Sequence, residues 1–284
     1  MILVFGKTGQ VALELARACD GREVRFLGRE AADLTDPAAC AAQIVALKPV
    51  LVINAAAYTA VDKAEDDAAT VQVVNGDAPR AMAEACAALD IPFVHISTDY
   101  VFDGAGTSPF KPADSTGPLG VYGATKRAGE IGILASGARA VILRTSWVVS
   151  AHGGNFIKTM LRLSETRDTL TVVADQIGGP TSAKAIAQAC LKIGQALGTG
   201  QNSGGIYHFS GAPDVSWAGF AREIFAQAGR GVEVTDIPTS AYPTAAKRPA
   251  NSRLECSSLA EDFGIDRPDW RADLTDILIE LGAK

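Results

Sequence analysis

The sequence predicts an α/β fold, in which a doubly wound parallel sheet is followed by a smaller C-terminal α/β lobe. Through the first half, short apolar runs rich in β-branched residues alternate with alanine-rich stretches, as strands and covering helices do in a parallel sheet. This alternation stops near residue 150. The 284 residues, 48% hydrophobic and 20% charged, are enough for one large domain or two unequal ones.

The first half contains five expected strands and four expected helices. The strands are expected at Ile2–Phe5, Val24–Leu27, 50–53, 93–96 and 140–143. The helices are expected at 11–19, Pro37–Leu47, 75–89 and 122–134. Because the strand segments are continuously apolar, we expect both faces of the sheet to be covered.

The second half has a less regular pattern. Helices are expected at 155–165, 183–197, 217–228 and 274–281, and a strand at 206–209. A surface turn is expected at 198–205 and an irregular segment at 237–252. The chain is therefore divided near residue 150, into a sheet domain of residues 1–150 and a lobe of residues 151–284.

Charge and cysteine content exclude several classes of protein. There are 26 Lys and Arg against 32 Asp and Glu, and a net charge of −6 argues against binding to nucleic acid or to an anionic membrane. The five cysteines are widely spaced without a C-x-x-C pair, which predicts reduced thiols rather than metal ligands. No stretch approaches the roughly 20 apolar residues of a membrane helix, and no targeting segment is recognised. We expect a cytoplasmic protein.

A glycine-rich motif follows the first expected strand. It reads Gly6-Lys7-Thr8-Gly9 and leads directly into a helix. Glycines let the backbone approach a pyrophosphate, and a helix N-terminus offers free N–H groups and a positive dipole end. Gly6, Thr8 and Gly9 are therefore candidate contacts to a dinucleotide, and the alternative is a tight turn that binds no ligand.

The ends of the next two strands indicate which dinucleotide is bound. The acidic residue that commonly binds the ribose of NAD is missing after the second strand, and Arg29 stands there instead. A guanidinium suits a 2′-phosphate and favours NADP, whereas the alternative is a solvated surface charge. Asp33 and Leu34 are placed to contact the adenine, and the small residues at 55–57 permit close passage of the nicotinamide half.

Hydroxyl groups and a Y-x-x-x-K motif predict the chemistry. Ser97 and Thr98 come at the end of the fourth expected strand, where open α/β sheets bind ligands. Tyr122 and Lys126 lie four residues apart on an expected helix, and therefore on one face of it. A nearby cation lowers the pKa of a phenol, so Tyr122 is predicted to be the general acid in a hydride reduction of a carbonyl. Lys126 is also placed to hold the nicotinamide ribose.

These motifs together resemble the extended short-chain dehydrogenase/reductase superfamily, whose sheet is Rossmann-like. Longer blocks are similar to the dTDP-4-dehydrorhamnose reductase family and run from end to end of the chain. They are GKTGQV at 6–11, NAAAYTAVDKAE at 54–65, STDYVFDG at 97–104, VYGATK at 121–126, RTSWV at 144–148, NFIKTML at 155–161, AYPTAAKRPANSRL at 241–254 and PDW at 268–270. The resemblance implies an oxidoreductase that uses NADPH, or alternatively NADH, to reduce the 4-keto group of dTDP-4-dehydro-L-rhamnose. This is the last step of dTDP-L-rhamnose synthesis, which supplies a nucleotide sugar for cell-surface polysaccharide.

The resemblance also implies roles for individual residues. Tyr122 is the proton donor, Lys126 is its partner, and Thr98 forms a hydrogen bond to the keto oxygen. The implied cofactor contacts are Gln10, Val11, Asp33, Leu34, Ala55, Ala56, Ala57 and Tyr58, in addition to the glycine motif and Arg29. The implied substrate contacts are Asp99, Tyr100, Trp147, Asn251 and Arg253. From the residues alone, Trp147 could equally be a core residue.

The same resemblance assigns the two parts of the chain. Residues 1–150 are implied to bind NAD(P), with helices of 155–200 also packed on them, and residues 151–284 are implied to bind mainly the sugar nucleotide. Its diphosphate needs positive groups, and Lys247, Arg248 and Arg253 are candidates.

Metal binding and assembly are less well defined. Some family members are magnesium-linked dimers held by glutamates, for which Glu14 and Glu280 are candidates. However, Lys184 stands where another carboxylate is expected, and its charge repels a metal. We therefore expect no firm metal site, and either a monomer or a homodimer.

Two other functions are compatible with the scaffold. A non-catalytic, NADP-binding regulatory subunit, like the beta subunit of methionine adenosyltransferase, has no need of the Thr98, Tyr122 and Lys126 set. A sugar-nucleotide epimerase or dehydratase is the other alternative. For a 4,6-dehydratase, an Asp-Glu pair is expected after Thr98, where this chain has Asp99 and Tyr100.

Overall fold

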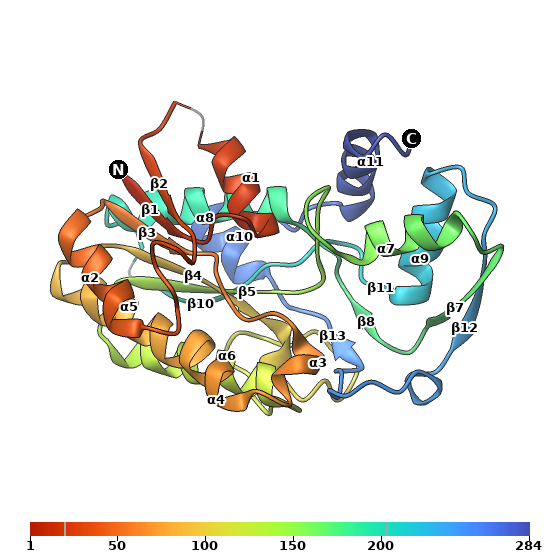
Figure 1. Ribbon diagram of the computed structural model, residues 1–284, viewed down its shortest axis with the longest axis horizontal. Coiled ribbons are helices and arrows are strands. Elements are labelled where there is room, and N and C mark those ends of the chain that lie inside the picture. The colour runs from red at the N-terminus through yellow and green to blue at the C-terminus, as the bar shows by residue number, and fades with distance from the viewer. Residues whose placement is uncertain (20, 203) are drawn as a thin grey trace.

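A six-stranded parallel sheet forms the centre of the larger part of the molecule (Figure 1). The protein is described by a computed structural model that covers residues 1–19, 21–202 and 204–284. The strand order is β10-β5-β4-β3-β1-β2. The strands are β1 (Ile2–Phe5), β2 (Val24–Leu27), β3 (Leu51–Asn54), β4 (Phe93–Thr98), β5 (Ala140–Thr145) and β10 (Gly205–His208). The predicted doubly wound parallel sheet is confirmed.

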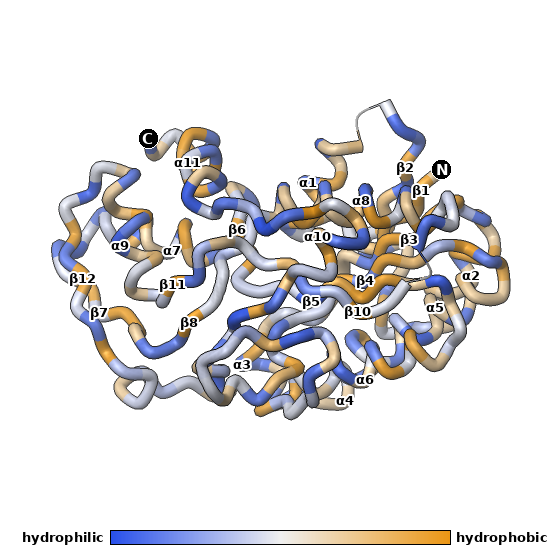
Figure 2. The backbone as a smooth tube through the Cα atoms, turned by 180° about the vertical axis from the view of Figure 1, so that it is seen from behind, coloured by the Kyte–Doolittle hydropathy of each residue, from blue (hydrophilic) through white to orange (hydrophobic). Residues whose placement is uncertain are grey.

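Helices cover both faces of this sheet. One face packs on α1 (Gln10–Ala18), α8 (Ala183–Gly198) and α10 (Ser257–Phe263), and the other on α2 (Pro37–Leu47), α5 (Ala78–Ala88) and α6 (Val121–Ala135). The alternation of side chains along β1 shows this division, since Val4 joins one apolar cluster and its neighbours Leu3 and Phe5 join the other. In Figure 2 the hydrophobic segments accordingly concentrate in the central strands.

Strand β10 extends the sheet beyond the fifth expected strand. The sequence predicted a strand at 206–209, and the structure pairs β10 in parallel with β5, with Ile206 beside Ile142. Helix α8 also packs on the sheet, whereas α7 (Phe156–Ser164) packs on the smaller lobe. Several elements after residue 150 thus complete the sheet, while the assignment of separate roles to 1–150 and 151–284 stays a prediction.

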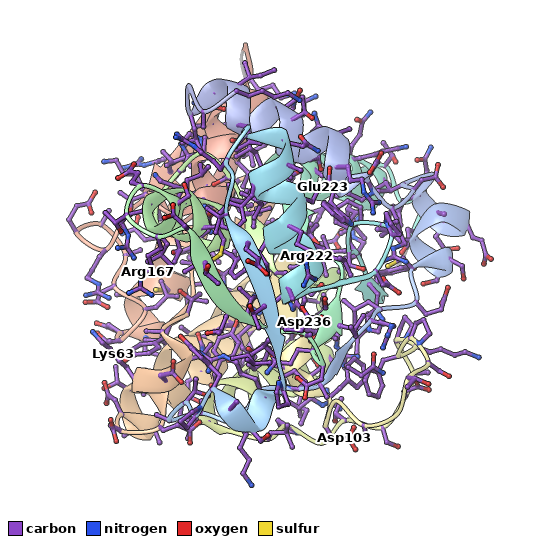
Figure 3. All side chains as sticks on the ribbon, turned by 90° about the vertical axis from the view of Figure 1, so that its right-hand side faces the viewer. Lys63, Asp103, Arg167, Arg222, Glu223 and Asp236 are labelled. Atoms are coloured by element: carbon purple, nitrogen blue, oxygen red, sulfur yellow. The ribbon has the colours of Figure 1, made fainter. Side chains whose placement is uncertain are left out.

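The smaller lobe has an apolar core of its own, which includes Ile157, Phe220 and Trp270. Its helices are α7, α9 (Trp217–Gln227) and α11 (Trp270–Glu280). Its short strands are β6 (Val148–Val149), β7 (Thr169–Val173), β8 (Ile177–Gly178), β9 (Thr181–Ser182), β11 (Val215–Ser216), β12 (Glu233–Ile237) and β13 (Asn251–Ser252). On the outer side of the lobe, Arg222 of α9 forms an ion pair of 2.6 Å with Asp236 of β12 (Figure 3).

Several boundaries differ from the sequence prediction. The helix expected at 75–89 is preceded by α3 (Val61–Ala64), α4 (Ala68–Gln72) and a π-helical turn η1 (Val73–Asp77), and α5 begins only after that turn. Strands β4 and β5 each run two residues further than expected, because Ser97 and Thr98 continue the parallel pairing with Arg144 and Thr145. The strands β7 and β12, helix α10, and the short 3₁₀ turns η2 (Asp99–Val101) and η3 (Thr239–Ala241) were not predicted.

The turn expected at 198–205 includes residue 203, which lies outside the described residues. Helix α8 ends at Gly198 and β10 begins at Gly205. All five cysteines are buried and free of disulfides. Within residues 1–19, 21–202 and 204–284, no helix is long and apolar enough to cross a membrane.

Candidate active site

A cavity of about 600 Å³ lies at the carboxyl ends of the first five strands. Its wall includes residues that directly follow each strand: Gly6 after β1, Gly28 after β2, Ala55 after β3, Asp99 after β4 and Ser146 after β5. This is the crevice in which open α/β sheets bind ligands, and the volume is within the usual range of ligand pockets.

The glycine motif forms one end of this cavity. Gly6 has a φ of +112°, and a Cβ there would approach the Ala55 carbonyl group to 3.3 Å. Gly9 is the N-cap of α1 without a side-chain hydrogen bond, and a Cβ added to it would meet no atom within 4 Å. The helix N-terminus is therefore left open toward the cavity. These features fit the diphosphate of a nicotinamide dinucleotide.

Two cations lie where the adenosine half is expected. Arg29 is exposed and lines the cavity, and Lys7 lines it with an ion pair of 3.3 Å to Glu30. Asp33 also lines it, but its carboxylate accepts a hydrogen bond from the Thr35 amide at 2.9 Å, which lowers the pKa of Asp33. Because Lys7 is paired with Glu30, Arg29 is the second cation at this end and the candidate contact to a phosphate group.

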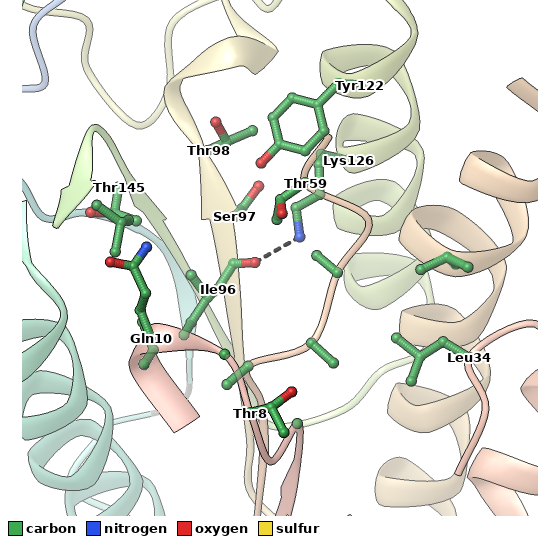
Figure 4. A pocket seen from close by; sticks show the side chains of 18 of the residues that line it. Thr8, Gln10, Leu34, Thr59, Ile96, Ser97, Thr98, Tyr122, Lys126 and Thr145 are labelled. Carbon is green, nitrogen blue, oxygen red and sulfur yellow. Dashed lines mark hydrogen bonds between the residues drawn. The ribbon is translucent and has the colours of Figure 1, made fainter. Parts of the chain in front are cut away.

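The predicted catalytic residues gather on one wall of the cavity. Thr98 ends β4, and Tyr122 and Lys126 stand one turn apart on α6 (Figure 4). Helix α6 can lie this close to its neighbours because of two glycines. A Cβ on Gly123 would overlap the carbonyl oxygen of Tyr100, and one on Gly129 would overlap that of Asn75.

The pKa of the phenol differs from the sequence prediction. Burial raises the pKa of Tyr122 to about 12, with a hydrogen bond to Thr98 acting in the opposite direction. The predicted lowering of this pKa by Lys126 is therefore wrong. Burial lowers the pKa of Lys126 to about 8, because the ammonium loses its solvation. A phenol with this pKa is protonated at neutral pH, as a proton donor must be.

Lys126 is held by groups that the sequence did not point to. Its Nζ donates to the Ile96 carbonyl at 2.7 Å and lies 2.9 Å from Nε2 of His95. Nδ1 of His95 lies 3.1 Å from Nδ2 of Asn54 on the neighbouring strand. Lys126 therefore has a fixed position beneath the cavity rather than a mobile side chain.

Two buried polar atoms of the cavity wall are left without a partner. Oδ2 of Asp99 and Oγ1 of Thr145 form no hydrogen bond among the described residues, and both residues line the cavity. Burial raises the pKa of Asp99 to about 6, while the hydroxyl groups of Ser252 and Thr98 act against this rise. Buried polar groups are normally paired, so these two atoms indicate where a polar ligand binds.

Trp147 reaches the cavity from the junction with the smaller lobe. Its backbone has a φ of +48°, which is unusual for a bulky residue. Its indole stacks on Trp217 of α9, with ring centroids 3.5 Å apart and planes 10° apart. A Cβ on Gly178 would come within 2.9 Å of the same indole. The contacts with Trp217 and Gly178 therefore fix the orientation of Trp147, which lines the cavity rather than a core.

Comparisons with known proteins agree on one family. A family model described as the RmlD substrate binding domain matches residues 1–282. The dTDP-4-dehydrorhamnose reductase of Sinorhizobium fredii is 46% identical over 95% of this chain and 93% of its own length. The chain belongs to the dTDP-4-dehydrorhamnose reductase family.

Solved structures of this family have the same fold. The dTDP-4-dehydrorhamnose reductase from Clostridium acetobutylicum gives a TM-score of 0.93 at 35% identity, covering 99% of both chains. The enzyme from Bacillus anthracis, solved in complex with NADP, gives 0.92 at 31% identity, covering 98% of both chains. A UDP-glucose 4-epimerase from Brucella ovis, 19% identical with a TM-score of 0.79, shares the fold of this reductase family.

Most of the cofactor contacts implied for the reductase family line the cavity. They are Gly6, Thr8, Gly9, Gln10, Val11, Arg29, Asp33, Leu34, Ala55, Ala56, Ala57, Tyr122 and Lys126. Tyr58 does not line this wall, and its backbone N–H and C=O are hydrogen-bonded to the side chain of Asn75. The oxygen of the Gln10 amide accepts hydrogen bonds from Ser150 and Asn155, which fixes its orientation.

The implied substrate contacts are only partly brought together. Thr98, Asp99, Tyr100 and Trp147 line the cavity, whereas Asn251 and Arg253 do not. Asn251 is buried and donates to the Ser108 carbonyl at 2.8 Å, and Arg253 donates to Asn251 at 3.0 Å. In this structure the pair holds the loop after β4, and its role in substrate binding stays a prediction.

The residues considered for magnesium form ion pairs instead. Arg17 binds Glu280 at 2.6 Å and Glu14 at 3.6 Å, and Lys184 binds Asp276 at 3.0 Å. In the described part of the chain, no group of three or more His, Cys, Asp or Glu is placed to hold a metal ion. A magnesium site of the reductase family is therefore not supported by this arrangement, and the oligomeric state stays a sequence-based prediction.

Sequence reasoning missed part of the cavity wall. The additional residues are Lys7, Leu27, Gly28, Ala32, Thr59, Val61, Val74, Ile96, Thr145, Ser146, Val148 and Gly154, while Ser97 was noted only as a strand-end hydroxyl. Thr145 and Ser146 were predictable as cavity residues, because they stand at a strand end inside the RTSWV block. Asn75 had none, since its role depends on the π-helical turn that brings its side chain to the loop of Tyr58.

Proposed function

We propose that this protein reduces the 4-keto group of dTDP-4-dehydro-L-rhamnose with NADPH, forming dTDP-L-rhamnose in the last step of dTDP-rhamnose synthesis. The observation that carries the proposal is the arrangement of one cavity. Thr98, Tyr122 and Lys126 stand on one wall, and an open helix N-terminus preceded by the glycine motif forms another part. The named relatives support the same reaction.

The residues divide the work of the reaction between them. A bound nicotinamide supplies the hydride that adds to C4 of the sugar. Tyr122 is protonated at neutral pH, and its hydroxyl donates the proton that the keto oxygen needs as it becomes an alcohol. The Thr98 hydroxyl accepts from the Tyr100 amide at 3.2 Å and lies 3.1 Å from Asp99, which holds it beside the phenol. Hydride and proton together balance the reduction.

The choice of NADPH rests on Arg29. It is exposed on the cavity wall at the end of β2, where an acidic residue would favour NADH. Its guanidinium can bind a 2′-phosphate through two parallel hydrogen bonds. NADH is the alternative cofactor, and it would lack this contact.

The sugar nucleotide is proposed to lie between the two parts of the chain. Trp147, which stacks on Trp217, offers a flat apolar surface for the sugar, and Asp99 and Tyr100 offer polar groups beside it. Arg248, considered for the diphosphate, already forms an ion pair of 2.8 Å with Asp62. Five free, buried cysteines fit a reducing compartment, so we also propose that the enzyme acts in the cytoplasm.

The test is an assay of NADPH oxidation with dTDP-4-dehydro-L-rhamnose, compared with UDP-linked and D-sugar analogues. We expect the dTDP-L-sugar to be reduced fastest. Tyr122→Phe should lower kcat by at least about a hundredfold, the usual effect of losing a general acid, while NADPH still binds. Tyr242→Phe is the matched control, because Tyr242 is exposed and does not line the cavity.

Two results would count against parts of this proposal, the first against the role of Tyr122 and the second against the reductase activity. Near-normal turnover by the Tyr122→Phe variant would exclude Tyr122 as the proton donor. Tight NADPH binding without oxidation by any of the sugar nucleotides would favour the non-catalytic regulatory subunit.

A further inference from the structure

The segment that joins strand β6 to helix α7 is bonded to helix α1 at two positions. Gln10 and Glu14 stand one turn apart on α1. The side chains of Ser150 and Asn155 both contact the Gln10 amide. Nε2 of His152 lies 3.0 Å from the buried Glu14 carboxylate. Nothing in the reaction proposed above uses Ser150 or Asn155.

Helix α7 fixes the orientation of the Asn155 amide. Asn155 is the N-cap of α7, and its Oδ1 accepts a hydrogen bond from the Lys158 amide at 3.2 Å. A backbone N–H can only donate, so the oxygen must face the helix and the NH₂ group must face away from it. Nδ2 of Asn155 accordingly donates to the Ser150 carbonyl at 2.7 Å and to Oε1 of Gln10 at 2.9 Å.

The orientation of the Gln10 amide follows from that of Asn155. Because Asn155 presents an NH₂ group, the end of the Gln10 amide that faces it must be the oxygen. The Ser150 hydroxyl, 2.8 Å from the same oxygen, can donate or accept and does not decide the orientation. The NH₂ group of Gln10 therefore points into the cavity that Gln10 lines (Figure 4). No residue that the structure describes accepts a hydrogen bond from this NH₂ group.

We propose that Asn155 is a positioning residue of the cofactor site, because it turns the NH₂ group of Gln10 toward an acceptor oxygen of the bound dinucleotide. That the ligand is NADPH rests on the function proposed above. Gln10 directly follows Gly9 at the start of α1, and it lies across the cavity from Leu34, which is placed to contact the adenine (Figure 4). The acceptors on this side are the oxygens of the diphosphate and of the nicotinamide carboxamide.

The direction of the Gln10 amide matters because both of these oxygens can only accept. A reversed amide would place its own oxygen against them, and the hydrogen bond would be lost. Asn155 excludes the reversed form before the cofactor arrives, so binding does not have to restrict the rotation of this side chain. A residue at the start of α7, in the smaller lobe, thus orders a contact in the cofactor site.

The contribution of the Gln10 amide is measured by binding alone, without substrate or turnover. Gln10→Met keeps the length of the side chain and removes its donor. The Kd for NADPH, taken from the quenching of tryptophan fluorescence at pH 7, should rise about tenfold. Gln188→Met is the matched control, because Gln188 is exposed on α8 and does not line the cavity. It should leave this Kd unchanged.

The part played by Asn155 is measured in a double-mutant cycle with Gln10. Asn155→Ser keeps an N-cap side chain for α7 but has no NH₂ group to hold the Gln10 oxygen. Alone, it should raise the Kd for NADPH about threefold or more. In the Gln10→Met background it should add almost nothing. An equal effect in both backgrounds would overturn the inference, since Asn155 would not be acting through Gln10, and so would an unchanged Kd in Asn155→Ser.

A neighbouring variant separates this role from a general disturbance of α7. Phe156 belongs to the same helical turn, but its ring packs on Trp217, with centroids 4.6 Å apart, and cannot hydrogen-bond to Gln10. Phe156→Leu should leave the Kd for NADPH unchanged. If it weakened binding as much as Asn155→Ser does, the effect of Asn155 would be that of a loosened helix and the inference would be wrong.

Three ligands identify the acceptor in the same variants. A loss in Gln10→Met that is equal for NADPH and for 2′-phospho-ADP-ribose, which lacks only the nicotinamide, assigns the NH₂ group to the diphosphate. A loss seen with NADPH alone assigns it to the carboxamide. Adenosine 2′-phosphate has neither group, and its affinity should not change. An equal loss for adenosine 2′-phosphate would overturn the inference, because the whole site would then be disturbed.

These measurements also separate the inference from the function on which it rests. Wild-type protein that does not bind NADPH would refute the proposed function. Wild-type protein that binds NADPH as tightly as the Gln10→Met variant does would refute only the positioning role.

Discussion

Replacing Glu130 by glutamine tests how much the buried ion pair between Glu130 of α6 and Arg144 of β5 contributes to the free energy of unfolding. Both Glu130 and Arg144 of β5 are completely buried, with exposed fractions of 0% and 1%. The carboxylate accepts from Arg144 Nε at 2.8 Å and Nη2 at 2.7 Å, and from the Ser97 hydroxyl at 2.7 Å. The variant has nearly the same shape, but its NH₂ group must face a guanidinium N–H.

The expected loss follows from leaving Arg144 buried and charged without its counter-ion. Removing one partner of a buried ion pair typically costs about 3–5 kcal/mol. Arg144 keeps contacts to the Pro112 carbonyl at 3.2 Å and to His208 at 3.4 Å, but neither carries a negative charge. The equilibrium constant for unfolding should therefore rise by roughly two to four powers of ten.

The assay is urea unfolding of the two proteins under identical conditions, with the free energy taken by linear extrapolation. Glu84→Gln is the matched control, since Glu84 forms an exposed, 3.9 Å ion pair with Arg80. This control should change the free energy of unfolding by less than about 0.5 kcal/mol. If Glu130→Gln lost no more than Glu84→Gln, the two buried groups would not be acting as a desolvated ion pair.

Three further predictions concern the cavity. Arg29→Ala should weaken the binding of NADPH by about tenfold or more and that of NADH much less, and equal losses would exclude a phosphate contact. Asp99→Asn should stabilise the protein near pH 7 by about 3 kcal/mol, because the raised pKa of about 6 penalises the folded carboxylate. This gain should shrink as the pH falls from 6 and vanish below about 4, where the carboxyl group is protonated in both states, and a gain independent of pH would contradict it. Trp217→Leu removes the stacking partner of Trp147 and should raise KM for the sugar nucleotide by about threefold to tenfold with a smaller change in kcat, and an unchanged KM would show that the stack does not orient Trp147.

The sheet was predictable because its pattern is local. In continuous apolar runs such as Ile2–Phe5, and in the alanine-rich segments between them, a few adjacent residues are enough to predict the type and the length of the element. The π-helical turn before α5 was missed, because residues such as Asn75 take their conformation from contacts with the loop of Tyr58 rather than from propensity. The strands β7 and β12 were missed because they pair with each other across about sixty residues of sequence.

The residues of the candidate site were likewise predictable where their sequence signal is local. Residues in short motifs, such as Gly6 and Tyr122, reach the cavity as expected. The raised pKa of Tyr122 was not predicted, because it depends on burial that only the assembled site produces. The pairing of Asn54 with His95 depends on the register of two strands, and no sequence spacing shows it.

The five buried thiols supply this protein with reporters of its own unfolding. Burial raises the pKa of Cys40 to about 11 and that of Cys86 and Cys190 to about 12, and it also raises the pKa of Cys19 and Cys256. A thiol reagent that attacks thiolates can therefore label these residues efficiently only when the surrounding structure opens. Cys40 and Cys86 belong to the apolar cluster on one face of the sheet, and Cys19 and Cys190 to that on the other. The order in which they are labelled would show which face of the sheet separates first.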